Sequence, residues 1–93
     1  MKFEYDPDAD AGYLRFTKEA VHRTVQVNFD TLVDLDHANQ AIGVEILFIQ
    51  ERIHEDPERF KKETLECARL LTQNQLHDLH RVLTNIMHAQ VVA

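Results

Sequence analysis

The sequence predicts an α+β domain in which an antiparallel sheet of four or five strands, over residues 2–48, is followed by two or three helices over residues 49–90. Apolar and polar residues alternate in short runs as far as residue 48, which is the period of half-buried strands. From Pro57 onward the apolar residues recur every three or four positions, which is the period of amphipathic helices. We expect one domain over residues 1–93, because a chain this short cannot supply two hydrophobic cores.

The first two strands are expected on either side of an acidic turn. Residues 2–5 alternate polar and apolar, and the run stops at Pro7, which has no backbone N–H to donate. We interpret residues 6–11 as a single helical turn with Asp6 as its N-cap. In the strand that follows, Leu14 and Phe16 share one face.

The remaining strands are expected to form a second hairpin preceded by a strand over residues 21–29. In that strand the residues interpreted as facing inward are Val21, Val25, Val27 and Phe29. The later hairpin pairs residues 31–36 with residues 41–48 around a turn in which Asn39 adopts a left-handed conformation. The last strand has the most regular apolar face, so we expect it at the centre of the sheet with an inward face formed by Ile42, Val44, Ile46 and Phe48.

Helix signals follow one another in the second half of the chain. Residues 49–55 fit a short helix, and Asp56 with Pro57 has the form of a cap followed by a first helical residue. Thr72 and Gln75 have the spacing of a capping box, which predicts that a new helix begins there.

Composition and charge restrict the classes of function. Residues 1–56 hold 12 acidic and 5 basic side chains, whereas residues 57–93 hold 4 acidic and 5 basic, so the acidity belongs to the strand-rich half. A net charge of −6 disfavours direct binding of nucleic acid. No apolar run is long enough for a membrane span. A single cysteine and no leader-like start predict a cytoplasmic protein without disulfides.

Two stretches resemble a known family. They are residues 1–16, MKFEYDPDADAGYLRF, and the pair VDLD at residues 33–36 and IGVEIL at residues 42–47. Together they resemble the prokaryotic domain-of-unknown-function family 2283, over the first half of the chain. The chain departs from that pattern at Asn39, where the family turn usually has glycine, and in a helical extension over residues 49–93. The resemblance implies a compact α+β core without an established activity, and some relatives resemble the small partner of toxin-like proteins.

Two groups of residues are weak candidates for a metal site. Asp6, Asp8 and Asp10 alternate along the acidic turn, and hard cations prefer several carboxylate oxygens. Helix capping explains the same residues, because acids are favoured at helix starts. His77 and His80 are three residues apart on the last helix, but a zinc site needs further ligands, and Cys67 lies on an apolar stripe.

Catalysis has little support in the sequence, and we expect no cofactor. Asp34, Asp36 and Glu45 could meet across the second hairpin, where close carboxylates raise one another's pKa. They are not accompanied by a nucleophile or a phosphate-binding loop, so an exposed polar sheet face is the favoured interpretation. The alternative hypothesis is a metal-dependent enzyme or metal-binding protein that uses clustered carboxylates, either Asp6, Asp8 and Asp10 or Asp34, Asp36 and Glu45.

The helices carry more apolar surface than one sheet face obviously needs. On the last helix this surface is a stripe formed by Leu76, Leu79, Leu83, Ile86 and Met87. The stripe packs either on the chain's own sheet or on a second copy, and we expect a homodimer with these residues at its interface. The sequence therefore predicts a non-enzymatic interaction module that self-associates through its C-terminal helices and, in a sharper version, acts as the regulatory or antitoxin-like partner of a basic protein.

Overall fold

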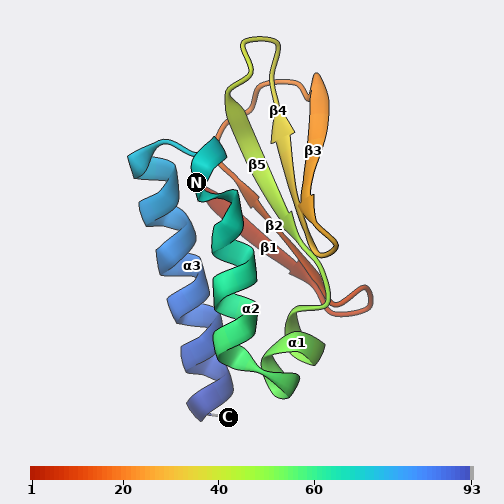
Figure 1. The fold of residues 1–93 in the computed structure, drawn as a ribbon, viewed down its shortest axis with the longest axis vertical. Helices are drawn as coiled ribbons and strands as arrows, with labels where there is room; N and C mark the ends of the chain where they lie inside the picture. The colour runs from red at the N-terminus through yellow and green to blue at the C-terminus, as the bar shows by residue number, and fades with distance from the viewer. Residues whose placement is uncertain (93) are drawn as a thin grey trace.

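The computed structural model describes the backbone of residues 1–92 and the side chains of residues 1–89. The chain forms five strands followed by helices, which confirms the predicted α+β fold (Figure 1). The strands are β1 (Lys2–Asp6), β2 (Ala11–Arg15), β3 (Arg23–Asn28), β4 (Thr31–Leu35) and β5 (Ala41–Ile46). The helices are α1 (Ile49–Glu55), α2 (Pro57–Thr64), the 3-10 helix η1 (Leu65–Leu70) and α3 (Gln73–Val92).

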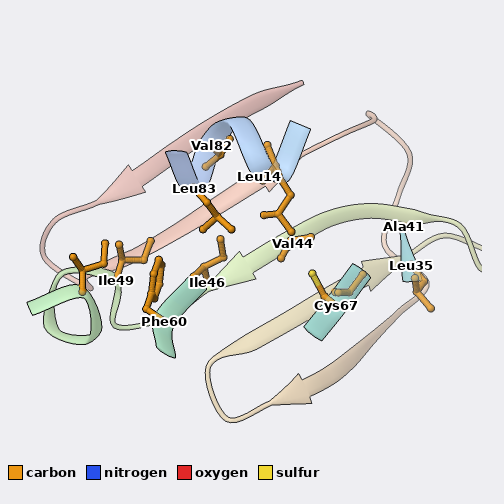
Figure 2. Close-up of a cluster of buried hydrophobic side chains, with 13 residues drawn as sticks. Leu14, Leu35, Ala41, Val44, Ile46, Ile49, Phe60, Cys67, Val82 and Leu83 are labelled. Carbon is orange, nitrogen blue, oxygen red and sulfur yellow. The ribbon is translucent and has the colours of Figure 1, made fainter. Parts of the chain in front are cut away.

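All described strand pairs are antiparallel, and the sheet order is β1-β2-β5-β4-β3. The central position of β5 agrees with its regular apolar face. In register, Val44 lies between Leu14 of β2 and Val33 of β4, and these three side chains are fully buried. The first residue of α1, Ile49, extends the same apolar layer beyond the end of β5 (Figure 2).

The helices cover one face of the sheet and leave the other face open (Figure 1). Figure 2 shows Leu83 of α3 and Phe60 of α2 directed at the sheet, close to Ile46. Phe60 and Leu83 are each 1% exposed. Burying one such side chain contributes about 1.5–3 kcal/mol, so the helices supply a large share of the stability of the domain.

Local signals begin and end the helices as the sequence indicates. The Asp56 carboxylate accepts a hydrogen bond from the backbone N–H of Arg59 at 3.1 Å. Thr72 and Gln75 form a reciprocal capping box, in which each side-chain oxygen accepts a hydrogen bond from the backbone N–H of the other residue. Asn39 has φ 62, the expected left-handed conformation.

Within residues 1–92, no helix combines the length and the apolar character that crossing a bilayer requires.

Three apolar residues interpreted as inward-facing lie at the surface. Val21 is 51% exposed because β3 begins only at Arg23, and Phe29 is 89% exposed because it lies in the turn between β3 and β4. Phe48 is 47% exposed because β5 ends at Ile46 and the chain turns into α1. The acidic turn also differs from the prediction: Asp6 accepts hydrogen bonds from two backbone N–H groups, but residues 7–10 form a turn and not a helix.

Candidate functional site

The predicted metal ligand Asp10 caps a helix that begins 39 residues later in the chain. Its backbone carbonyl accepts a hydrogen bond from the N–H of Ile49 at 3.0 Å. Its carboxylate accepts hydrogen bonds from the N–H of Gln50 at 2.8 Å, from the N–H of Glu51 at 3.1 Å and from the hydroxyl of Tyr5 at 2.7 Å. One residue therefore accepts hydrogen bonds from the first three N–H groups of α1, which α-helices leave unpaired.

The electrostatic consequences of this cap are visible in two pKa values. Burial alone would raise the pKa of Asp10, but the hydrogen bonds from Tyr5 and the helix N–H groups, together with His54, outweigh burial and lower it. The hydrogen bond to Asp10 is the main cause that raises the pKa of Tyr5 to about 12. These shifts indicate that the Asp10 carboxylate serves the fold as an anion.

The other candidate metal ligands lie apart from one another. Asp6 binds the backbone of its own turn, and Asp8 is exposed. His77 and His80 are exposed on α3, whereas Cys67 is fully buried in η1. Within residues 1–92, no three His, Cys, Asp or Glu side chains are grouped so that they could hold a metal ion. Burial raises the pKa of the Cys67 thiol to about 11, so this thiol is protonated at neutral pH.

The open face of the sheet carries a polar network centred on Asp34. The Tyr13 hydroxyl donates to Asp34 at 2.7 Å, and the Thr24 hydroxyl donates to the other carboxylate oxygen at 2.5 Å. Tyr13 crosses β5 at Gly43, where any Cβ would overlap the tyrosine ring. Burial, with the hydrogen bond to Asp34, raises the pKa of Tyr13. Each oxygen of the Asp34 carboxylate therefore accepts a hydrogen bond from a side chain of the protein itself.

The other two carboxylates of that hypothesis make contacts of their own. One Asp36 carboxylate oxygen accepts hydrogen bonds from the N–H groups of Ala38 and Gln40, and so shapes the turn between β4 and β5. Glu45 is half-buried opposite Tyr13. Within residues 1–92, these three acids are not grouped so that they could hold a metal ion.

A different group gathers at one end of the sheet, where the β3–β4 turn lies near the start of α1 (Figure 1). We call it the acidic-aromatic end, and it consists of Phe29, Asp30, Phe48, Glu51 and Glu55. The backbone connects its two parts, because the N–H of Leu47 donates to the carbonyl of Asp30 at 2.9 Å. All of these side chains except Phe29 line, together with Arg52, a hollow of about 330 Å³, which we call the outer hollow.

Phe48 is unusual in this group on two counts. Its backbone lies in the left-handed region with φ 53, where a residue with a Cβ costs about 1–2 kcal/mol relative to a right-handed one. Its ring is also 47% exposed, so part of its apolar surface is open to a partner. Such a strained, exposed aromatic side chain is a reason to suspect function.

Arg52 forms the inner boundary of this end. Its side chain is 11% exposed, and its guanidinium lies 4.8 Å from the centre of the Phe60 ring. It donates to the carbonyl of Leu47 at 2.9 Å and to the carboxylate of Glu63 at 3.3 Å. Its Nε lies 3.5 Å from Asp30, near enough for an ion pair but without a hydrogen bond. A second hollow of about 130 Å³, which we call the inner hollow, adjoins this cluster; its lining residues are Asp30, Arg52, Glu55, Asp56, Arg59, Phe60 and Glu63.

The sequence analysis missed the acidic-aromatic end. A signal existed for Phe29, because Phe29 and Asp30 are the only residues between the two apolar runs that became β3 and β4. The side chain of Asn28 also accepts a hydrogen bond from the N–H of Asp30, as turn-forming residues commonly do. Phe48 gave no such signal, because it continues the alternation of β5.

The predicted interface stripe on α3 divides into two parts. Leu79 and Leu83 are 0% and 1% exposed and lie in the core of a single chain. Leu76, Ile86 and Met87 are half-buried, and the last two also pack against this core. Pairing of two copies through this stripe stays a prediction, and only these three side chains retain surface for it.

Comparison with known proteins concerns the strand-rich half. The family model described as "Protein of unknown function (DUF2283)" matches residues 2–49, just over half of the chain. The chain belongs to the DUF2283 family. The DUF2283 match covers all five strands and ends at the first residue of α1, so the helices that cover the inner face of the sheet lie beyond it. Searches of curated proteins and of solved structures found no significant match.

Side chains join the DUF2283 core to these helices at two further points. The Asn28 amide donates to the carbonyl of Glu63 at 3.0 Å and to the carboxylate of Glu66 at 2.8 Å. The Gln75 amide donates to the carbonyl of Ala41 at 2.9 Å. The acidic-aromatic end therefore lies where the family core and the helical extension meet, with Phe29, Asp30 and Phe48 from the core and the glutamates from α1.

Proposed function

We propose that this protein is a non-enzymatic interaction module that binds a basic protein through its acidic-aromatic end. The observation that carries the proposal is the exposure of two phenylalanine rings. Phe48, 47% exposed, lines the outer hollow with the carboxylates of Asp30, Glu51 and Glu55, and Phe29, 89% exposed, precedes Asp30 in the chain. Exposed aromatic residues are typical of the centres of protein interfaces, and surrounding charge selects the partner and speeds its approach. The acidic half of the chain adds a longer-range attraction for a positively charged surface.

The remaining chemistry of the chain supports binding over catalysis. The thiol of Cys67 is buried and protonated at neutral pH, and the Asp34 carboxylate is engaged by two hydroxyl groups. The raised pKa values of Tyr5 and Tyr13 keep both phenols protonated near neutral pH. A buried, protonated thiol and protonated phenols are poor nucleophiles, and this supports a binding role. A regulatory or antitoxin-like role would follow if the basic partner is itself an active protein that this chain masks.

The proposal is tested by co-purification with a matched pair of variants. We expect the tagged wild-type chain to recover a defined basic protein from its host and to re-form the complex from the two purified components. The double variant Phe29→Ser/Phe48→Asn should lose this complex, whereas Val21→Ser, which removes an exposed apolar side chain elsewhere, should retain it. Binding should also weaken as salt increases, because salt screens exposed charges. A partner that is neutral or acidic, or that binds the double variant equally well, would contradict the proposal.

A further inference from the structure

We infer that the acidic-aromatic end recognises arginine side chains of its partner in preference to lysine. This inference rests on the proposed function and specifies the chemistry of the same surface. The outer hollow combines the half-exposed ring of Phe48 with the carboxylates of Asp30, Glu51 and Glu55. A guanidinium is planar, stacks on aromatic rings and donates to carboxylates in a fixed fork, whereas an ammonium group offers a compact charge without a stacking face.

The protein already binds one of its own arginines in this way, immediately beside the outer hollow. The guanidinium of Arg52 lies over the ring of Phe60, at 4.8 Å from its centre, and is paired with Asp30 and Glu63. Asp30 lines both the inner and the outer hollow. An aromatic ring and carboxylates thus occur on both sides of Asp30. On the inner side they hold an internal guanidinium, and on the outer side they face solvent.

Charge complementarity selects a basic segment as the occupant. The outer hollow has three carboxylates and one base, Arg52, which is paired with Asp30 of this hollow and with Glu63. The carboxylates of Glu51 and Glu55 lie outside that ion-pair cluster and remain for a partner. Phe29, the residue before Asp30, adds a second exposed ring for an apolar neighbour of the arginine. A hollow of about 330 Å³ has room for an arginine side chain.

The test compares two peptides of equal length and charge, acetyl-Ala-Arg-Ala-Arg-Ala-amide and its lysine counterpart, by NMR titration of the labelled full-length chain. We expect the arginine peptide to bind about three- to tenfold more tightly, which corresponds to one stacking interaction. The backbone signals that shift should be those of residues 29–30 and 48–55.

Variants identify which groups cause the preference. Phe48→Leu keeps an apolar side chain but removes the aromatic ring, so it should reduce the arginine preference to less than about twofold. Glu51→Gln should weaken both peptides, whereas Glu58→Gln, the same change at an exposed residue that lines neither hollow, should weaken neither. Equal affinity for the two peptides, or no shift at this end with either one, would overturn the inference. Equal affinity for the two peptides would contradict the arginine preference but not the proposed binding of a basic protein. The proposed binding is tested separately, by the co-purification experiment.

Discussion

Replacing Asp10 tests whether a residue at the first turn of the chain controls the start of α1. In the variant Asp10→Ala, the N–H groups of Gln50 and Glu51 and the hydroxyl of Tyr5 lose their acceptor. Loss of an N-cap side chain alone costs about 0.5–2 kcal/mol. Because Asp10 is charged and only partly exposed, we expect a loss near or slightly above the upper value, about 2–3 kcal/mol.

Thermal unfolding followed by circular dichroism measures this loss. In a domain of this size, each kcal/mol shifts Tm by about 4–8 °C, so Asp10→Ala should lower Tm by roughly 8–24 °C. The matched control is Asp8→Ala, two residues away and exposed, which should change the free energy of unfolding by less than about 0.5 kcal/mol. Equal Tm values for the two variants would refute the role assigned to Asp10.

The pH dependence gives an independent check with a defined sign. The pKa of Asp10 is lower in the folded protein than in the unfolded chain, so the ionised carboxylate stabilises the fold at pH values above about 4. This contribution is lost as the pH falls through the lowered folded-state pKa. The difference in stability between the wild-type chain and Asp10→Asn should therefore be largest near neutral pH and shrink in acid. A difference that stays constant between neutral pH and strong acid would contradict this reasoning.

Three further changes probe the sheet and the helices that cover it. Thr31→Val should raise the free energy of unfolding by about 1 kcal/mol in urea titration, because the buried Thr31 hydroxyl has no hydrogen-bond partner; a loss of stability would count against that. Gly43→Ala should displace the ring of Tyr13, and spectrophotometric titration should then show one tyrosine ionising near its ordinary pKa of about 10. A chain that ends at Asp56 should misfold or self-associate in light scattering, because it exposes the inner face of the sheet; a folded monomer would disprove this.

Features set by neighbouring residues could be predicted from the sequence. The cap at Asp56, the capping box of Thr72 and Gln75 and the left-handed Asn39 each depend on chemistry within about four residues, and each is present. The central position of β5 could also be predicted, because only a strand with neighbours on both sides is buried along nearly its whole length. Local signals and burial patterns were enough to predict the fold class.

Long-range contacts could not be predicted in this way. Nothing near Asp10 in the sequence indicates that its carboxylate binds the N–H groups of Gln50 and Glu51, because the spacing is set by the length of four intervening strands and their turns. The same applies to Arg52, which meets Asp30 from the β3–β4 turn and Glu63 from α2. The residues that hold the two halves of the chain together emerge only once the sheet order is known.

The misplaced phenylalanines show why a pattern of alternation fails at this site in particular. Alternation assigns Phe48 to the core because it counts residue types, but the strand has ended two residues earlier and a left-handed residue turns the chain toward α1. A sequence selected for stability alone would favour glycine or asparagine at that position, since both tolerate positive φ at lower cost. Departures from local rules are expected where a protein gives up stability for function. The left-handed, half-exposed Phe48 beside the acids of α1 is such a departure, and it supports the binding role proposed for this ring.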